Sequence, residues 1–349
     1  MIKELTSLRG IFILFIFFHH CLNLYTGGGS LAVTFFFIAS GFSLTLGYHN
    51  RVKEPTFSFK QYITRRAVKF YPLHWICLLV SLPLVFTPSN WKQLPILVTN
   101  AALMQSWIPM QDIYFSFNSV SWFLSDILFF AAVFPFVYRW IDGASQKSRY
   151  TVVIAVLIFY VVLAISLPPE HRHAVLYINP LVRLLDFMFG IFLAKIFLQL
   201  KDNNRVNDVI GSHRLLVELI IITTIALLVI ESCILSKDVR LISPVYWLFV
   251  STVIVLSALL GINGGGYFLR SKILSSLGEN SFTIFLVHQL VLRYTKKFFE
   301  ICQYESNLIY ILTTFTLTIL IGLFVERVVL KPLTRWINTR ILQSMTARS

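Results

Sequence analysis

Long apolar runs separated by short polar segments recur along the whole chain. Runs such as Ile11–Tyr25, Leu215–Leu235 and Leu308–Val325 approach or reach the roughly 20 apolar residues that a helix needs to cross a bilayer. The pattern predicts an all-α fold, a polytopic transmembrane helical bundle formed by one integral membrane domain over residues 1–349. We expect ten spanning helices, near residues 8–25, 30–48, 72–88, 121–138, 150–167, 178–200, 215–235, 244–262, 281–296 and 308–326.

The distribution of Lys and Arg indicates how these helices are oriented. The formal net charge is +14, yet the cations lie in short segments between apolar runs rather than along one soluble face, which argues against nucleic acid as a partner. With a cytoplasmic N-terminus, the clusters in 51–71, 139–149, 201–214 and 327–349 all fall inside, as the positive-inside rule requires. If the apolar segment 93–108 also spanned, the later clusters would change sides. We therefore expect 93–108 to form a re-entrant or interfacial helix and the C-terminus to be cytoplasmic.

An arginine and a histidine in the first helix are candidates for catalysis. Ionisable side chains in hydrocarbon cost at least about 2.5 kcal/mol each on insertion scales, so those that persist usually line a functional cavity. Arg9 and His20 are eleven residues apart, which places them on one helix face and about 16 Å apart along the axis. His19 points roughly 80° away from Arg9. The spacing favours His20 as the functional histidine.

The basic end of segment 51–71 is a candidate for binding phosphate. Arg65, Arg66 and Lys69 stand at positions i, i+1 and i+4, so they would share one face of an interfacial helix. Cations on that face suit the phosphates of a donor. Juxtamembrane cations also commonly do no more than set orientation and contact anionic lipid.

Other polar or small residues at membrane depth have both structural and functional interpretations. Asp126, near the outer start of a predicted helix, could orient an imidazole or simply satisfy a polar gap. The small residues 39–41 permit a close approach of either a ligand or another helix. Arg183 and Asp186, at i and i+3, predict a structural salt bridge, and His288 predicts an interhelical hydrogen bond.

Taken together, these segments resemble the acyltransferase 3 family of integral membrane acyltransferases, whose members modify surface polysaccharides, lipopolysaccharide, peptidoglycan and small molecules. The stretch Leu5–Ile11 followed by His20 is similar to the family's opening, Phe35–Phe42 to its FFxxSGF signature, and Arg65–Pro72 to its RRxxRxxP loop. The resemblance continues, in the expected order, through Trp122–Asp126, Arg183–Gly190 and Ser281–His288. Lys69 departs from the usual Arg and loses its bidentate fork, and Asp126 departs from the usual Glu, which shortens the side chain by one methylene.

The resemblance implies a membrane O-acyltransferase, most often an O-acetyltransferase, of the bacterial inner membrane. Its co-substrate would be acetyl-CoA or another short acyl-CoA from the cytoplasm, and its acceptor a hydroxyl of a surface glycan or lipid-linked saccharide. No metal is implied. The alternative is a transporter or flippase for a lipid-linked saccharide, in which the intramembrane cations would line a translocation path. No inverted repeat in the sequence supports the alternative.

The resemblance also implies roles for individual residues. His20 would act as general base on the acceptor hydroxyl or be transiently acylated, and the residues leave both routes open. Asp126 would fix its tautomer, and Arg9 would help to orient the donor. The residues implied in donor binding are Arg65, Arg66, Lys69, Tyr71 and Ser40.

Overall fold

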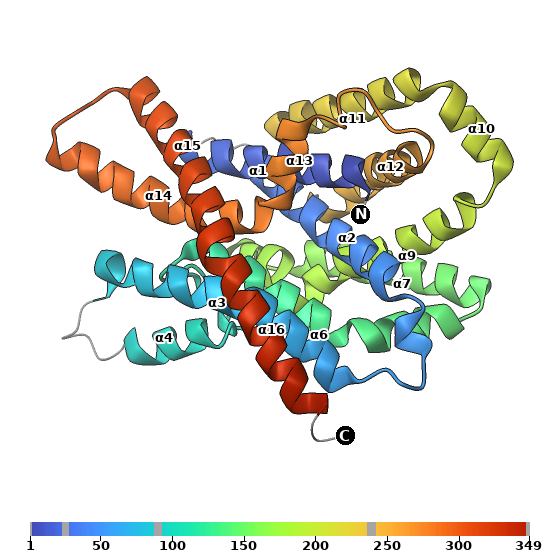
Figure 1. Ribbon diagram of the computed structural model, residues 1–349, viewed down its shortest axis with the longest axis horizontal. Helices are drawn as coiled ribbons and strands as arrows, with labels where there is room; N and C mark the ends of the chain where they lie inside the picture. The colour runs from blue at the N-terminus through green and yellow to red at the C-terminus, as the bar shows by residue number, and fades with distance from the viewer. Residues whose placement is uncertain (1, 23–27, 87–92, 236–241, 347–349) are drawn as a thin grey trace. The chain divides into compact units, whose positions relative to one another are not determined.

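The computed structural model describes residues 2–22, 28–86, 93–235 and 242–346, and they are mostly helical, with no strand among them (Figure 1). The α-helices are α1 (Lys3–Cys21), α2 (Gly28–Tyr48), α3 (Phe59–Val85), α4 (Gln93–Ala101), α5 (Gln111–Tyr114), α6 (Trp122–Gly143), α7 (Gln146–Ser166), α8 (Pro169–Arg172), α9 (Pro180–Leu200), α10 (Asn204–Ser212), α11 (Arg214–Leu235), α12 (Ile242–Ile262), α13 (Lys272–Glu279), α14 (Ser281–Ile301), α15 (Asn307–Phe324) and α16 (Lys331–Thr346). Shorter helical turns are η1 (Arg51–Lys53), η2 (Gln105–Trp107), η3 (Ser119–Ser121), η4 (His173–Ile178) and η6 (Val325–Leu330). The all-α prediction is confirmed.

Seven helical stretches in the described residues are long and apolar enough to cross a membrane, which makes the chain a multi-pass membrane protein. They are Lys3–Cys21, Gly29–Tyr48, Phe59–Val85, Ser119–Gly143, Gln146–Ser166, Arg214–Ser232 and Asn307–Arg340. The three other predicted spans also fall on helices, namely α9, α12 and α14. These are less apolar or have shorter apolar stretches, and the number of ten spans stays a prediction. The predicted ends at 25 and 88 lie outside the described residues.

Helix α3 begins earlier than predicted. The sequence predicts a polar loop up to Tyr71 and a span from Pro72, whereas the helix begins at Phe59 and continues to Val85. Ser58 caps its start by accepting a hydrogen bond from the Gln61 N–H at 3.4 Å. Pro72, at which the span was predicted to begin, lies inside this helix, although proline usually begins a helix or breaks one. The basic residues of this segment therefore belong to the first turns of a spanning helix, and not to a separate interfacial one.

The apolar segment 93–108 does not span. Helix α4 has nine residues, which corresponds to about 14 Å against the ~30 Å hydrocarbon core of a bilayer. The chain then forms the short turn η2. Helix α4 is therefore too short to span, as predicted, and its re-entrant or interfacial placement stays a prediction.

The chain forms two compact units. The first comprises residues 1–57 and 133–279, and the second comprises 58–132 and 280–349. The assignment of 1–349 to a single domain stays a prediction.

Within the first unit, α2 and α9 pack at backbone contact. A methyl group added to Gly41 would overlap the Phe187 carbonyl oxygen, and one added to Gly190 would overlap the Ile38 carbonyl oxygen. Only glycine permits so close an approach from both sides. The small residues of segment 39–41 therefore serve helix packing at Gly41.

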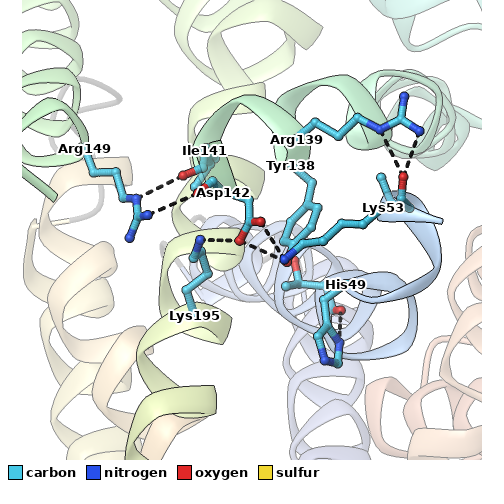
Figure 2. A network of polar contacts seen from close by, with 10 residues as sticks. His49, Lys53, Tyr138, Arg139, Ile141, Asp142, Arg149 and Lys195 are labelled. Atoms are coloured by element: carbon cyan, nitrogen blue, oxygen red, sulfur yellow. Dashed lines mark hydrogen bonds and ion pairs between the residues drawn. The ribbon is translucent and has the colours of Figure 1, made fainter. Parts of the chain in front are cut away.

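A charged network in the first unit joins segments that are far apart in sequence (Figure 2). The Asp142 carboxylate accepts from the Lys53 ammonium at 2.6 Å and from the Lys195 ammonium at 2.7 Å. The hydrogen bond to Asp142 raises the pKa of Lys53. Arg139 donates twice to the Val52 carbonyl oxygen, at 3.0 and 2.7 Å.

This network indicates that the chain between Lys53 and Asp142 crosses the membrane an even number of times. Lys53 follows α2 and Asp142 ends α6, so the contact between them requires the intervening chain to leave and return to the same face. Helices α3 and α6 supply two crossings, and a third across 93–108 would place the two side chains on opposite faces. The contact of Lys195 with Asp142 adds the end of α9 to this face.

Candidate active site

A cavity of about 700 Å³ lies in the first unit, near the start of α1. Its volume falls within the range of small-ligand sites. The lining is rich in cations, which suits an anionic ligand. The lining residues are Ile2, Lys3, Glu4, Leu5, Thr6, Arg9, Ser43, Leu46, Gly47, Gly261 and Arg270.

Arg9 reaches this cavity from α1. Its Nη2 donates a hydrogen bond to the Ser43 hydroxyl of α2 at 3.1 Å. This bond fixes one edge of the guanidinium, which has further N–H groups available to a carbonyl or phosphate oxygen. The structure thus places Arg9, a predicted site residue, at a cavity and beside Ser43.

Two buried carboxylates hold the loop 263–271, which carries Arg270 to the cavity. Glu4 accepts from the Gly266 N–H at 3.2 Å and from the Arg270 Nε at 2.9 Å, and it is only 1 % exposed. Glu218 accepts two further backbone N–H groups of the same loop at 2.8 and 2.7 Å. Hydrogen bonds to charged acceptors are stronger than neutral ones, so the loop is firmly positioned.

Replacing Gly265 with alanine is expected to loosen this loop. Its φ of +78° lies in the left-handed region, where an L side chain costs about 1–2 kcal/mol. An added methyl group would also overlap the Arg270 Nε and the Glu4 carboxylate. We expect Gly265→Ala to lower the midpoint of thermal unfolding in detergent by several degrees.

Gly211→Ala is the matched control. Gly211 lies in α10, and nothing stands within 4 Å of an added methyl group there. Alanine is a better helix former than glycine by about 0.8–1 kcal/mol, so this variant should be neutral or slightly stabilised. Equal midpoints for the two variants would refute the role given to Gly265.

His20 lies in the last turn of α1, and its ring is held by its own helix. The Nδ1 atom is 3.0 Å from the Ile16 carbonyl oxygen. A carbonyl oxygen only accepts, so this contact requires a proton on Nδ1, and in a neutral ring Nε2 then bears the lone pair. His20 is half-buried, and the neighbouring His19 ring is nearly perpendicular to it, with 5.1 Å between centroids. The tautomer suits a general base acting through Nε2.

The predicted donor residue Ser40 is not among the described residues that line this cavity. Ser43, one helical turn further along α2, lines it, and the donor-binding role of Ser40 stays a prediction. Sequence reasoning also missed Lys3 and Arg270. The repeat of serine at i and i+3 on one helix face is the signal that could have identified Ser43.

The predicted phosphate-binding cations lie on α3, in the second unit. Arg65 and Lys69 are exposed, and the guanidinium of Arg66 lies over the Tyr62 ring, 5.3 Å from its centroid. The Tyr71 hydroxyl donates to the Ala102 carbonyl oxygen at 3.1 Å, so it ties α3 to the segment after α4. The roles of all four in donor binding stay predictions.

Asp126 is fully buried on α6, also in the second unit. A chain of buried polar side chains surrounds this part of the helix, in which Ser106 donates to Ser125 at 2.7 Å and Gln105 donates to Ser121 at 3.1 Å. A buried polar network of this kind positions side chains tightly. His20 and Asp126 belong to different units, and their pairing stays a prediction.

Arg183, Asp186 and His288 are buried and make local polar contacts. Arg183 and Asp186 form the predicted salt bridge at 3.0 Å, each 1 % exposed. His288 is fully buried, and its Nδ1 contacts the Phe285 carbonyl oxygen at 2.5 Å. This hydrogen bond lies within α14, and the predicted bond to another helix stays a prediction.

Comparison with known proteins identifies the family of this chain. A protein-family profile described as an acyltransferase domain, the acyltransferase 3 family, matches residues 2–327. The chain belongs to this family. The acyltransferase is also 30% identical over 289 residues to Acyltransferase MdmB of Streptomyces mycarofaciens, which covers 76% of this chain and 69% of that protein. No solved structure matches the acyltransferase significantly.

The family assignment gives the cavity and the histidine a chemical context. An acyltransferase must bind an activated acyl donor and accept a proton from the attacking group. In this acyltransferase, a cation-lined cavity and a histidine with a defined tautomer lie along the same helix, α1. The protein is therefore a multi-pass membrane acyltransferase with a candidate site built on α1.

Proposed function

We propose that the protein transfers an acetyl group from acetyl-CoA to a hydroxyl of a surface glycan or a related saccharide. It acts in the bacterial inner membrane, with both termini in the cytoplasm, where acetyl-CoA is made. The observation that carries the proposal is the arrangement on α1. Arg9 lines a cationic cavity, and His20, about 16 Å further along the helix, presents Nε2 as a base.

The donor side of the proposal rests on charge. CoA carries several phosphates, and Lys3, Arg9 and Arg270 line the cavity at the start of α1. Arg65, Arg66 and Lys69 bind phosphate groups as well, with Tyr71 and Ser40 assisting. A thioester arm that extends from Lys3, Arg9 and Arg270 along α1 brings its carbonyl carbon towards His20.

The transfer step needs one base and one leaving group. The acceptor hydroxyl oxygen attacks the thioester carbonyl carbon, an ester C–O bond forms, and the C–S bond breaks. The hydroxyl proton passes to His20 Nε2 and then to the departing CoA thiolate. Arg9 orients the donor. An acyl-histidine route has the same overall balance, because His20 attacks first and the acceptor hydroxyl then displaces it.

The proposal is tested by transfer of label from radiolabelled acetyl-CoA into the surface-glycan fraction of membranes that contain the protein. We expect Arg9→Gln to raise the KM for acetyl-CoA about tenfold, which corresponds to ~1.4 kcal/mol, because a charged hydrogen bond to the donor is lost. Arg205→Gln removes a cation from α10, which does not line the cavity among the described residues, and should leave the KM unchanged. No label transfer by the wild type, from acetyl-CoA or succinyl-CoA, would refute the proposal.

A further inference from the structure

A second cavity lies in the second unit, with a volume of about 410 Å³. It is separate from the site on α1, and none of the predicted site residues lines it within the described chain. Its walls come from the end of α3, from α4, from the segment 112–119 and from α14. The lining residues are Val85, Gln93, Ile96, Asp112, Phe115, Ser116, Phe117, Ser119, Gln289 and Arg293.

The wall formed by segment 112–119 is held in place by α14. Arg293 donates to the Phe117 carbonyl oxygen at 2.7 Å. Phe117 has a φ of +56°, a conformation that is uncommon for a bulky residue and that needs support from its surroundings. Its side chain is 5 % exposed. Arg293 thus gives the cavity a defined wall and contributes a positive charge to it.

The polar groups of the cavity both donate and accept hydrogen bonds. Gln93 and Gln289 each carry an amide, and two serines carry hydroxyls. The Oε1 atom of Gln289 is buried and accepts no hydrogen bond from the described residues. Gln289 thus adds polar character to the α14 wall of the cavity.

The two charges in the lining cancel, so the cavity has no net positive charge to attract an anion. Asp112 and Arg293 contribute one charge of each sign, so a phosphate or a CoA ligand would face a carboxylate as well as a guanidinium. A neutral polyhydroxylated ligand can donate to the carboxylate and accept from the guanidinium at once. Phe115, which is half-buried, adds an aromatic side chain to the lining that can contact the C–H face of a sugar ring.

The position of the cavity along α3 also fits an acceptor. Val85, which lines it, ends the helix, and Lys69 lies sixteen residues earlier. The two are about 24 Å apart along the axis, a distance close to the ~30 Å hydrocarbon core. The cavity and the basic turns of α3 thus lie at opposite ends of one spanning helix.

We propose that this cavity binds the acceptor as a neutral sugar residue, through Asp112, Gln289 and Arg293. That the bound sugar is the acceptor rests on the proposed function, whereas the binding of a sugar rests on the cavity alone. It assigns the two substrates to different sites, with the saccharide held by the second unit.

The test is photolabelling of the full-length protein in lipid nanodiscs by a methyl hexopyranoside that carries a diazirine. Mass spectrometry should find labelled peptides within 111–119 or 289–293, and excess methyl hexopyranoside should suppress the label. Gln289→Leu and Asp112→Asn each remove one polar contact and should lower the competable labelling about tenfold. Lys297→Gln, which removes an exposed cation from the same helix α14, should label as the wild type does.

The outcomes separate this inference from the proposed function. Competable label found only elsewhere, no competable label at all, or wild-type labelling of both Gln289→Leu and Asp112→Asn would overturn the sugar site. Hydrolysis of acetyl-CoA by the same samples reports on the donor reaction alone. If the sugar labels the cavity and acetyl-CoA is untouched, the proposed function fails and the sugar site stands.

Discussion

Replacing His20 with alanine is expected to lower the rate of acyl transfer by about 10²–10⁴-fold, the usual contribution of a general base. The hydrogen bond from Nδ1 to the Ile16 carbonyl oxygen orients Nε2, and alanine removes both the base and its orientation. The side chain is half-buried and its bond lies within its own helix, so the fold should persist. The measurement is kcat for label transfer at saturating acetyl-CoA.

Two further variants sharpen this test. His20→Gln keeps a polar side chain of similar size but has no basic nitrogen, so it should be as inactive as alanine. His19→Ala removes the neighbouring imidazole and should retain most of the activity. A His20→Ala enzyme within a few-fold of wild type, or a His19→Ala enzyme that alone is inactive, would move the catalytic role away from His20.

Replacing Asp186 with alanine is expected to cost about 3–5 kcal/mol of stability, because it leaves the buried Arg183 without its counter-ion. The carboxylate also accepts from the Trp247 Nε1 at 2.5 Å, so a contact with α12 is lost as well. Arg183 further donates to the Thr34 hydroxyl of α2 at 3.0 Å. The yield of monodisperse protein in detergent and the midpoint of thermal unfolding should both fall sharply.

Controls distinguish a buried ion pair from a general effect of losing an acid. Asp202→Ala, at an exposed site, should change stability by less than about 0.5 kcal/mol. The double variant Arg183→Met, Asp186→Leu should recover much of the loss, since apolar side chains of similar volume often replace a buried pair without cost. An Asp186→Ala protein as stable as wild type would show that the pair contributes little.

The sequence predicted the helical fold well, because a lipid environment leaves few alternatives to apolar helices. It misplaced the start of α3, because Pro72 signals a boundary locally, while the capping by Ser58 and the packing of the preceding turns decide the outcome. It predicted the non-spanning segment 93–108 from charge alone. The contact between Lys53 and Asp142 is an independent reason to expect no crossing by 93–108, and it can be seen only in the folded chain.

The candidate site was predictable only where its residues share one helix. The spacing of Arg9 and His20 follows from helical geometry. The other side chains at the cavity, Ser43, Glu4 and Arg270, come from segments that are distant in sequence. No local sequence pattern predicts these contacts. The hydrogen bond that sets the tautomer of His20 is likewise invisible in a sequence, because it depends on a rotamer.

Close backbone packing at glycines has a consequence for how quickly a donor is captured. Gly10 of α1 abuts the Leu274 carbonyl oxygen, as Gly41 of α2 abuts that of Phe187, so the helices that carry Arg9 and Ser43 are each in backbone contact with a neighbour. Passage into the cavity then depends on the side chains at its rim, such as the 45 % exposed Arg270. Exposed side chains change rotamer within picoseconds to nanoseconds, whereas helices slide over microseconds or longer. Donor capture should therefore be limited by encounter from solution rather than by opening of the bundle.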